Sequence, residues 1–342
     1  MEVVLTVLLA AHLLAVNLGS AGPLLCIWLH GRAFRHGDPV ADAVGRDLAR
    51  YALAATTVGL LLGGAILAWM FYQGDSPFLR AAGQFPPSRW WFATGEIAFY
   101  YVCMFAYLAL WTRWSQRPFW HGLLAVSAAT NMLYHFPPLW TMVTTLAQHP
   151  QMAELHIDPA QYRRLLVDPE IASRVVHSWL AAVAVAGTAL VWLAAGRGTV
   201  SGGEDPQRRI AVGGAWIALI PTGIQFLVGM WVLVELPAEA RDAVIGGDLP
   251  STALLLTSLT FTLVLLHILV GVAGGGVDRR SARRAVIVLA LVVLLMSGTL
   301  RRIRHLSETA QSRLPAGPVV AEAKSAMATG TQGGMGLEAT EL

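Results

Sequence analysis

The sequence is dominated by eight long apolar stretches separated by polar connections. An α-helix of about 20 apolar residues spans the hydrocarbon core of a bilayer. Only 13% of the residues are charged, against roughly a quarter in soluble domains, so polar groups cannot cover the surface of this chain. We therefore predict an all-α, polytopic transmembrane helical bundle of about eight helices. These are expected at about residues 3–29, 50–73, 90–112, 119–146, 173–195, 209–235, 251–273 and 284–301.

Arginines are concentrated in alternate connections between the apolar stretches. By the positive-inside rule, the odd-numbered connections then face the cytoplasm and the N-terminus lies outside. We expect a multi-pass protein of a bacterial-type cytoplasmic membrane. No basic stripe is interleaved with aromatic residues, so nucleic acid is not an expected partner. The arginines of the odd connections are Arg32, Arg35 and Arg46, then Arg113 and Arg117, then Arg197, Arg208 and Arg209, and finally Arg279, Arg280, Arg283 and Arg284.

The two ends of the chain differ in composition. The N-terminus opens directly into apolar sequence without a basic segment, so the first stretch is interpreted as a retained helix and not as a cleaved signal peptide. Residues 1–305 are expected to form the transmembrane domain. Residues 306–342 are rich in Gly, Ala, Ser, Thr and Glu and predict a disordered polar tail. Cys26 and Cys103 lie inside apolar stretches and are interpreted as small apolar fillers.

Ionisable residues are rare inside the predicted spans, and each one is costly there unless it is paired or ligated. At a rise of 1.5 Å per residue, His12 and His135 would lie about 14–17 Å below the outer surface. Glu96 and His177 would lie nearer that surface, while His267 falls in the inner half. The outer-half groups suit haem carried between helices, where ligands project inward from facing helices. The candidates are His12, Glu96, His135, His177 and His267, with Met230 as a thioether candidate.

Other interpretations of the same residues stay open. A lone histidine inside a span can simply form a hydrogen bond between helices. His135 precedes Pro137 and Pro138, so its ring could fill the kink that they produce. Glu96 could extend its carboxylate to the membrane surface, Met230 could be core filler, and His267 is interpreted as structural.

Several segments resemble subunit I of cytochrome bd-type quinol oxidases. The stretch Leu166–Glu170, followed by Arg174–Ser178, is similar to the family segment that carries a low-spin haem b histidine. Ala129–Asn131 is similar to a Ser-Asn stretch of the fourth helix. His12 and Glu96 stand near the family's first-helix histidine and third-helix glutamate. The resemblance covers about residues 5–240, and the 40–70 stretch also resembles the entry into the second helix.

The resemblance implies a set of site residues. His177 would hold a low-spin haem b with Met230 opposite, and His12 would hold a second haem. Glu96 would act as a catalytic group, either ligand or proton carrier, and His135 would belong to the cofactor site. The connection at 236–250 is short where the family carries a long quinol loop. The Gly-Arg-Gln-Pro-Trp motif and the seventh-helix methionine have no counterpart, so one or two haem b groups are expected and a haem d or third haem stays open.

The function implied is a haem-binding membrane subunit of a respiratory electron-transfer complex, acting as an oxidoreductase that could pass electrons to oxygen. Its partners would be the bilayer, other membrane subunits, and a cytochrome c or quinol donor. Two alternatives remain. One is a haem-free membrane anchor or assembly subunit of a larger complex. The other is a proton-coupled transporter, although paired broken helices in matching halves are lacking.

Overall fold

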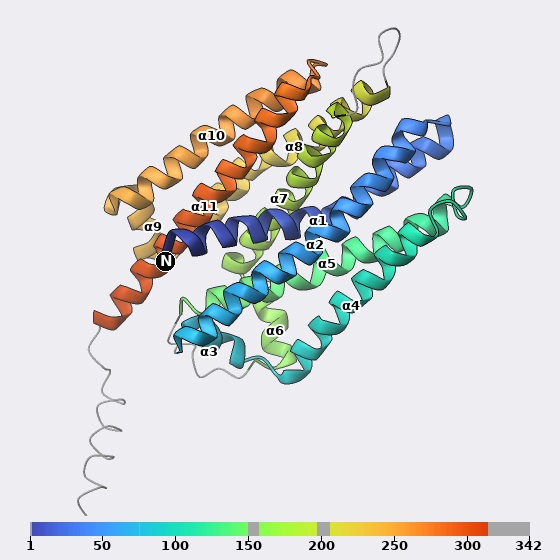
Figure 1. Ribbon diagram of the computed structural model, residues 1–342. Helices are drawn as coiled ribbons and strands as arrows, with labels where there is room; N and C mark the ends of the chain where they lie inside the picture. The colour runs from blue at the N-terminus through green and yellow to red at the C-terminus, as the bar shows by residue number, and fades with distance from the viewer. Residues whose placement is uncertain (1, 75, 150–156, 197–205, 314–342) are drawn as a thin grey trace, which may run out of the picture.

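Eight long helices run side by side through the molecule (Figure 1). The computed structural model describes residues 2–74, 76–149, 157–196 and 206–313, and every regular element in these ranges is helical. Seven of the eight predicted stretches each fall within one long helix, and the stretch predicted at 90–112 runs three residues past the end of its helix at Ala109, so the all-α fold class is confirmed. The long helices are α1 (Glu2–His36), α2 (Pro39–Gln73), α4 (Pro87–Ala109), α5 (Pro118–Leu146), α7 (Pro169–Ala195), α8 (Pro206–Glu235), α10 (Leu249–Ala273) and α11 (Arg279–Arg313).

Seven of these helices are long and apolar enough to cross a membrane, and the chain is a multi-pass membrane protein. The exception is α5, which has 29 residues but carries His121, Asn131 and His135 along its length. It still packs against α1, α4 and α7 as a full-length member of the bundle. His121 and Asn131 are buried, whereas His135 is partly exposed.

The connections gather at two ends of the bundle (Figure 1). The turns α1–α2, α4–α5 and α10–α11, the end of α7 and the start of α8 lie at one end, which we call the arginine-rich end because it carries Arg32, Arg117, Arg208 and Arg279. The opposite end, here the N-terminal end, holds the start of α1 and the short helices α3 (Pro77–Gly83), α6 (Pro159–Leu166) and α9 (Ala238–Asp242). These short helices were not predicted.

The first connection is much shorter than the sequence suggested. A loop was expected over residues 30–49, but α1 continues to His36 and α2 begins at Pro39. Gly37 takes a φ of 58°, and the Asp38 side chain accepts hydrogen bonds from the amides of Val40 and Ala41 at 3.1 and 3.0 Å. The left-handed Gly37 ends α1, and the Asp38 cap followed by Pro39 begins α2. Helix extensions beyond the bilayer need no apolar composition, so hydropathy alone could not find them.

The C-terminal boundary also differs from the expected one. Helix α11 ends at Arg313, past the boundary expected at residue 305. The rest of the expected tail, 314–342, lies outside the described residues. The two cysteines are free and buried, which agrees with their interpretation as apolar fillers.

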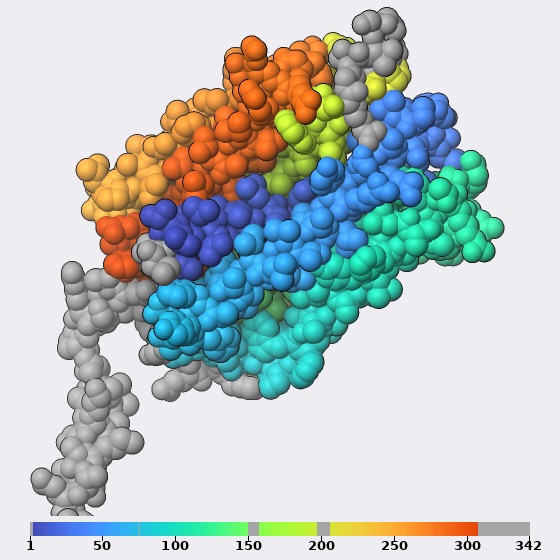
Figure 2. All heavy atoms as spheres, in the orientation of Figure 1, coloured from blue at the N-terminus to red at the C-terminus, as the bar shows by residue number. Residues whose placement is uncertain are grey.

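Helix α1 lies at the centre of the bundle and contacts α2, α5, α7 and α11. Figure 2 shows α1 between α2 and α11 on the visible face. Glycines allow close backbone contact elsewhere: a Cβ atom at Gly187 on α7 would lie 2.7 Å from the Ala218 amide nitrogen and 2.9 Å from the Gly214 carbonyl of α8. Small residues are the usual means of tight helix packing in membranes.

Candidate functional site

Three of the predicted ligands, His12, His135 and His177, lie at similar depths in the half of the bundle near the N-terminal end. Interhelical hydrogen bonds set the relative heights of the helices, and counting from them at 1.5 Å per residue places the three histidines within about one helical turn of one another. We call them the histidine layer. The hydrogen bonds are Tyr100 Oη to Gly19 O (3.0 Å), Asn131 Nδ2 to Glu96 O (2.7 Å) and Trp179 Nε1 to Leu133 O (2.7 Å).

The imidazole of His12 is held against α2. Its Nδ1 donates to the Gly59 carbonyl at 2.8 Å, because a carbonyl oxygen can only accept. A Cβ atom at Gly63 would lie 2.8 Å from His12 Cε1, so the ring occupies the space that this glycine leaves. The tautomer is thereby fixed with the Nε2 lone pair unused. Histidines that bind metals are usually oriented by such a hydrogen bond from the other ring nitrogen.

His135 on α5 faces Glu96 on α4. The His135 Nε2 and Glu96 Oε2 atoms are 3.8 Å apart, with the two side chains 31% and 17% exposed. A cavity of about 10 Å³ adjoins His135 and is also lined by Arg89 and Tyr162. That volume accommodates about one water molecule. The arrangement suits an imidazole–carboxylate pair that holds or passes a proton.

His177 on α7 has no hydrogen-bond partner for its ring. Its Nδ1 atom is buried and unpaired, and Nε2 makes no hydrogen bond with the described residues either. Only its backbone carbonyl is engaged, by Gln225 Nε2 at 3.3 Å. A buried polar group without a partner requires an explanation, and a ligand is one of them.

The structure places Met230 and His267 away from the histidine layer. Met230 is 59% exposed on α8. It lies five residues after Gln225, the residue that touches α7, and at 3.6 residues per turn it is on a different face of α8. His267 is exposed on α10. Met230 as the second ligand therefore stays a sequence prediction without geometric support.

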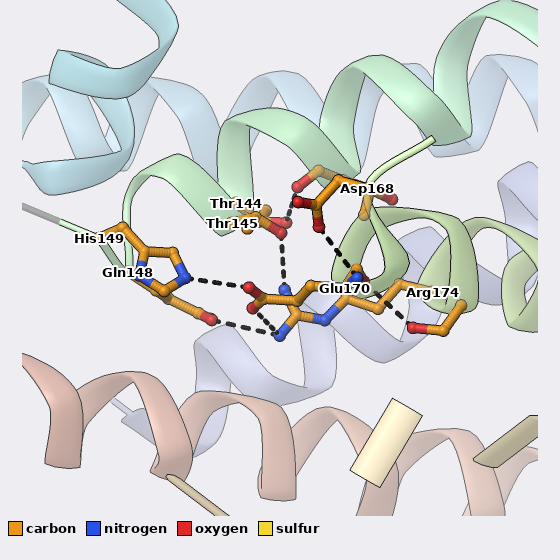
Figure 3. A network of polar contacts seen from close by, with 9 residues as sticks. Thr144, Thr145, Gln148, His149, Asp168, Glu170 and Arg174 are labelled. Carbon is orange, nitrogen blue, oxygen red and sulfur yellow. Dashed lines mark hydrogen bonds and ion pairs between the residues drawn. The ribbon is translucent and has the colours of Figure 1, made fainter. Parts of the chain in front are cut away.

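A polar network fixes the start of α7, one turn from His177 (Figure 3). Arg174 donates to Thr145 Oγ1 and to Glu170 Oε1, each at 2.7 Å. His149 Nε2 lies 3.0 Å from Glu170 Oε2, so the network joins the end of α5 to α7. The Asp168 side chain accepts from the Glu170 amide and begins the helix. This network includes the stretch that carries the sequence resemblance.

Sequence reasoning missed a second pair of histidines, His30 on α1 and His121 on α5. Both are buried near the arginine-rich end, where their ring centroids are 4.5 Å apart. The sequence contained only weak evidence for this pair. His30 was assigned to a loop, and His121 lay too close to the start of its helix to stand out.

The residues present fit haem by donor chemistry. Within the described part of the chain, no group of three or more His, Cys, Asp and Glu side chains could hold a bare metal ion. Haem requires much less of the protein, because one or two axial side chains bind its iron. His12 offers an oriented, unused Nε2, and His177 offers a ring with no protein partner.

Comparison with solved structures finds chains of similar fold. A chain in the structure of bd oxidase from Geobacillus thermodenitrificans matches with a TM-score of 0.65, covering 90% of this chain and 86% of that chain. The chain has the fold of a bd oxidase chain. Sequence identity is 16%, so the bd oxidase likeness concerns the fold. No protein-family model matches the sequence, and no curated protein matches it either.

Proposed function

We propose that the chain is a haem-binding membrane subunit of a respiratory electron-transfer complex. The observation that carries this proposal is the histidine layer within a bd oxidase fold. In that layer the His12 imidazole is oriented with a free Nε2 atom, and the His177 imidazole is buried without a hydrogen-bond partner. Neither feature is needed for helix packing, because an apolar side chain would fill the same space at less cost.

The roles follow from the contacts. His12 and His177 would hold b-type haem, which would supply one-electron chemistry when bound. The Gly59 carbonyl orients the His12 ring, and Gly63 makes room for it. Glu96 and His135 hold a proton beside the layer, and His135 serves this pair instead of ligating iron.

Topology and partners are part of the proposal. The arginine-rich end faces the cytoplasm of a bacterial-type cell, and the N-terminus faces outside. Other membrane subunits assemble around the bundle, and a cytochrome c or quinol delivers electrons. The short connection between α8 and α10, residues 236–248, favours a donor that does not need a long binding loop.

A haem-free anchor subunit is the second candidate. The exposure of Met230 and the one-water cavity at His135 favour it, because neither provides a second ligand or a large space. Haem content separates the two candidates.

The test is a haem measurement on the purified protein in detergent. We expect a dithionite-reduced α-band and one or two haems per chain by the pyridine haemochrome assay. His177→Ala and His12→Ala should each lower haem content while the protein remains folded. His267→Ala is the matched control, since this histidine is exposed and outside the layer. Haem absent from folded wild-type protein, or unchanged in both variants, would refute the assignment.

A further inference from the structure

A sealed cluster of rings lies near the arginine-rich end, apart from the histidine layer. His121 is fully buried on α5 and stacks on Tyr107 of α4 with ring centroids 3.9 Å apart. His30 of α1 meets His121 edge to face at 4.5 Å. Trp111, just after α4, packs against both imidazoles at 5.9 and 5.3 Å. Three helices thus enclose two histidines in an aromatic box.

Four buried polar atoms of this box make no hydrogen bond. They are both ring nitrogens of His30, Nδ1 of His121 and the Tyr107 hydroxyl. An unsatisfied buried polar group costs about 1–3 kcal/mol, so four in one place are not explained by packing. Apolar rings would have filled the same space without that cost.

The tautomer of one histidine is fixed. His121 Nε2 donates to the Tyr107 carbonyl at 2.8 Å, which leaves Nδ1 as a bare acceptor. His30, when neutral, carries one N–H and one lone pair. The two rings are therefore complementary: an N–H of His30 can donate to Nδ1 of His121, and its other nitrogen remains able to accept a proton.

The charges around the pair are few. Asp42 of α2 acts electrostatically on both imidazoles, and its Oδ1 accepts from Trp111 Nε1 at 3.0 Å. From α1 the neighbour is Cys26, whose Sγ lies 3.5 Å from the Gly45 carbonyl, and from α4 it is Tyr107. Arg46 lies one turn beyond Asp42 on α2. One carboxylate is thus available to balance one positive charge on the pair.

The pair is close to the arginine-rich surface. His30 lies six residues before the end of α1 at His36, which is about 9 Å along the helix. His121 lies three residues after the start of α5 at Pro118, or about 5 Å. A proton from water at this end has to travel only one or two helical turns.

We propose that His30 and His121 form a proton-binding site that takes up one proton from the arginine-rich end. The proton adds to the free nitrogen of the His30–His121 pair, giving an imidazolium that shares an N–H···N bond with its partner. The Asp42 carboxylate balances the new charge, and no bond between heavy atoms forms or breaks. This site does not depend on haem, so it can be tested independently of the proposed function.

Nitrogen NMR of ring-¹⁵N-histidine protein in detergent, recorded from pH 3 to 9, tests this site. We expect two of the ten histidines to titrate together, each changing when the other is replaced. His30→Phe and His121→Phe identify the two signals, with His30→Asn as a smaller change should the first variant not fold. His36→Phe is the matched control, because His36 is exposed on the same helix end. Asp42→Asn should weaken proton binding about tenfold, moving the titration to lower pH.

Two outcomes would overturn the proposal. One is a pair of neutral rings with fixed tautomers across the whole pH range, which would make the box a structural contact. The other is stoichiometric zinc or copper in the purified protein, measured by elemental analysis, with both signals changed by chelation. Titration in protein that lacks haem would support the proton site and count against the proposed function alone.

Discussion

The histidine layer and the His30–His121 pair lie in opposite halves of the bundle, and α1 and α5 each contribute a histidine to both. The ring nitrogens of the two groups make different contacts. In the layer, the His12 ring donates to a backbone carbonyl of α2 and the His135 ring faces a carboxylate of α4, whereas the His177 ring has no hydrogen-bond partner. In the pair, His121 is oriented by the Tyr107 carbonyl and ring, whereas His30 is held only by ring contacts with His121 and Trp111.

That difference separates two uses of buried histidine. A ring fixed by a backbone carbonyl presents one lone pair in a constant direction, as a ligand to iron must. In the pair, His121 is also held by a backbone carbonyl, but His30 makes no hydrogen bond and can change its protonation state. The contrast predicts that substitutions at the layer alter cofactor binding, whereas substitutions at the pair alter stability and titration.

The largest expected effect is at Gly63. Gly63→Val should displace the His12 ring, because a Cβ atom there already lies 2.8 Å from Cε1. The Gly59 hydrogen bond is then lost, and loss of such a bond typically lowers metal affinity by about 10–100-fold. Haem titration of detergent-purified protein, monitored by the Soret band, measures the change.

The neighbouring Gly64 supplies the control. A Cβ atom there meets nothing within 4 Å, so Gly64→Val changes the same helix without touching His12. Equal haem affinity in both variants would show that the orientation of His12 is irrelevant, and the layer would then resemble the pair.

Asp42→Ala is expected to have the next largest effect, on stability. The substitution leaves the indole N–H of Trp111, which is buried, without its acceptor. The cost should be about 1–3 kcal/mol, measured by thermal or denaturant unfolding in detergent. Asp47→Ala on the same helix is the control: its ion pair with Arg50 is largely exposed at 3.4 Å and should contribute about 0–1 kcal/mol. A similar loss of stability in both variants would mean that the hydrogen bond from Trp111 to Asp42 does not stabilise the protein.

Much of the fold could be predicted from the sequence, for a simple reason. Seven of the long helices are apolar enough over 18 residues to span a bilayer, and in a bilayer that pattern admits little besides a helix. The helix ends could not be found in this way. The extensions to His36 and from Pro39 are amphiphilic, and the signals of Gly37 and Asp38 are only local.

The candidate site was predicted unevenly. His12, His135 and His177 stood out because each interrupts a long apolar stretch, and depth along the helix then grouped them. The direction in which each helix turns its side chains could not be predicted from the sequence, so only the structure showed that Met230 is exposed. The His30–His121 contact joins residues far apart in the chain, and neither residue is central in its apolar stretch.

A pH effect of moderate size is expected at the arginine-rich end. Burial alone would raise the pKa of Asp38, but hydrogen bonds from the Ala41 amide and from Arg32 hold it below its usual value. The contribution to stability is therefore complete above the unfolded-state pKa, about 4, and is lost as pH falls through the lower folded-state pKa.

Asp38→Asn should keep the helix cap but remove the charge interaction with Arg32, lowering stability by about 1 kcal/mol at pH 7. The difference from wild type should shrink as the pH falls below about 4. Melting temperatures measured from pH 3 to 7 test this, with Asp158→Asn, a cap at the N-terminal end, as the comparison. A constant difference across that range would contradict the assignment to the Asp38 charge.

The smallest expected effect is at Glu96. Its carboxylate lies 3.8 Å from His135 Nε2 in a partly exposed pair, so Glu96→Gln should change stability by less than about 1 kcal/mol. Haem content should stay at the wild-type level, unlike that of Gly63→Val. If haem were lost instead, Glu96 would be an iron ligand, and the layer would bind its cofactor through α4 as well as through α1 and α7.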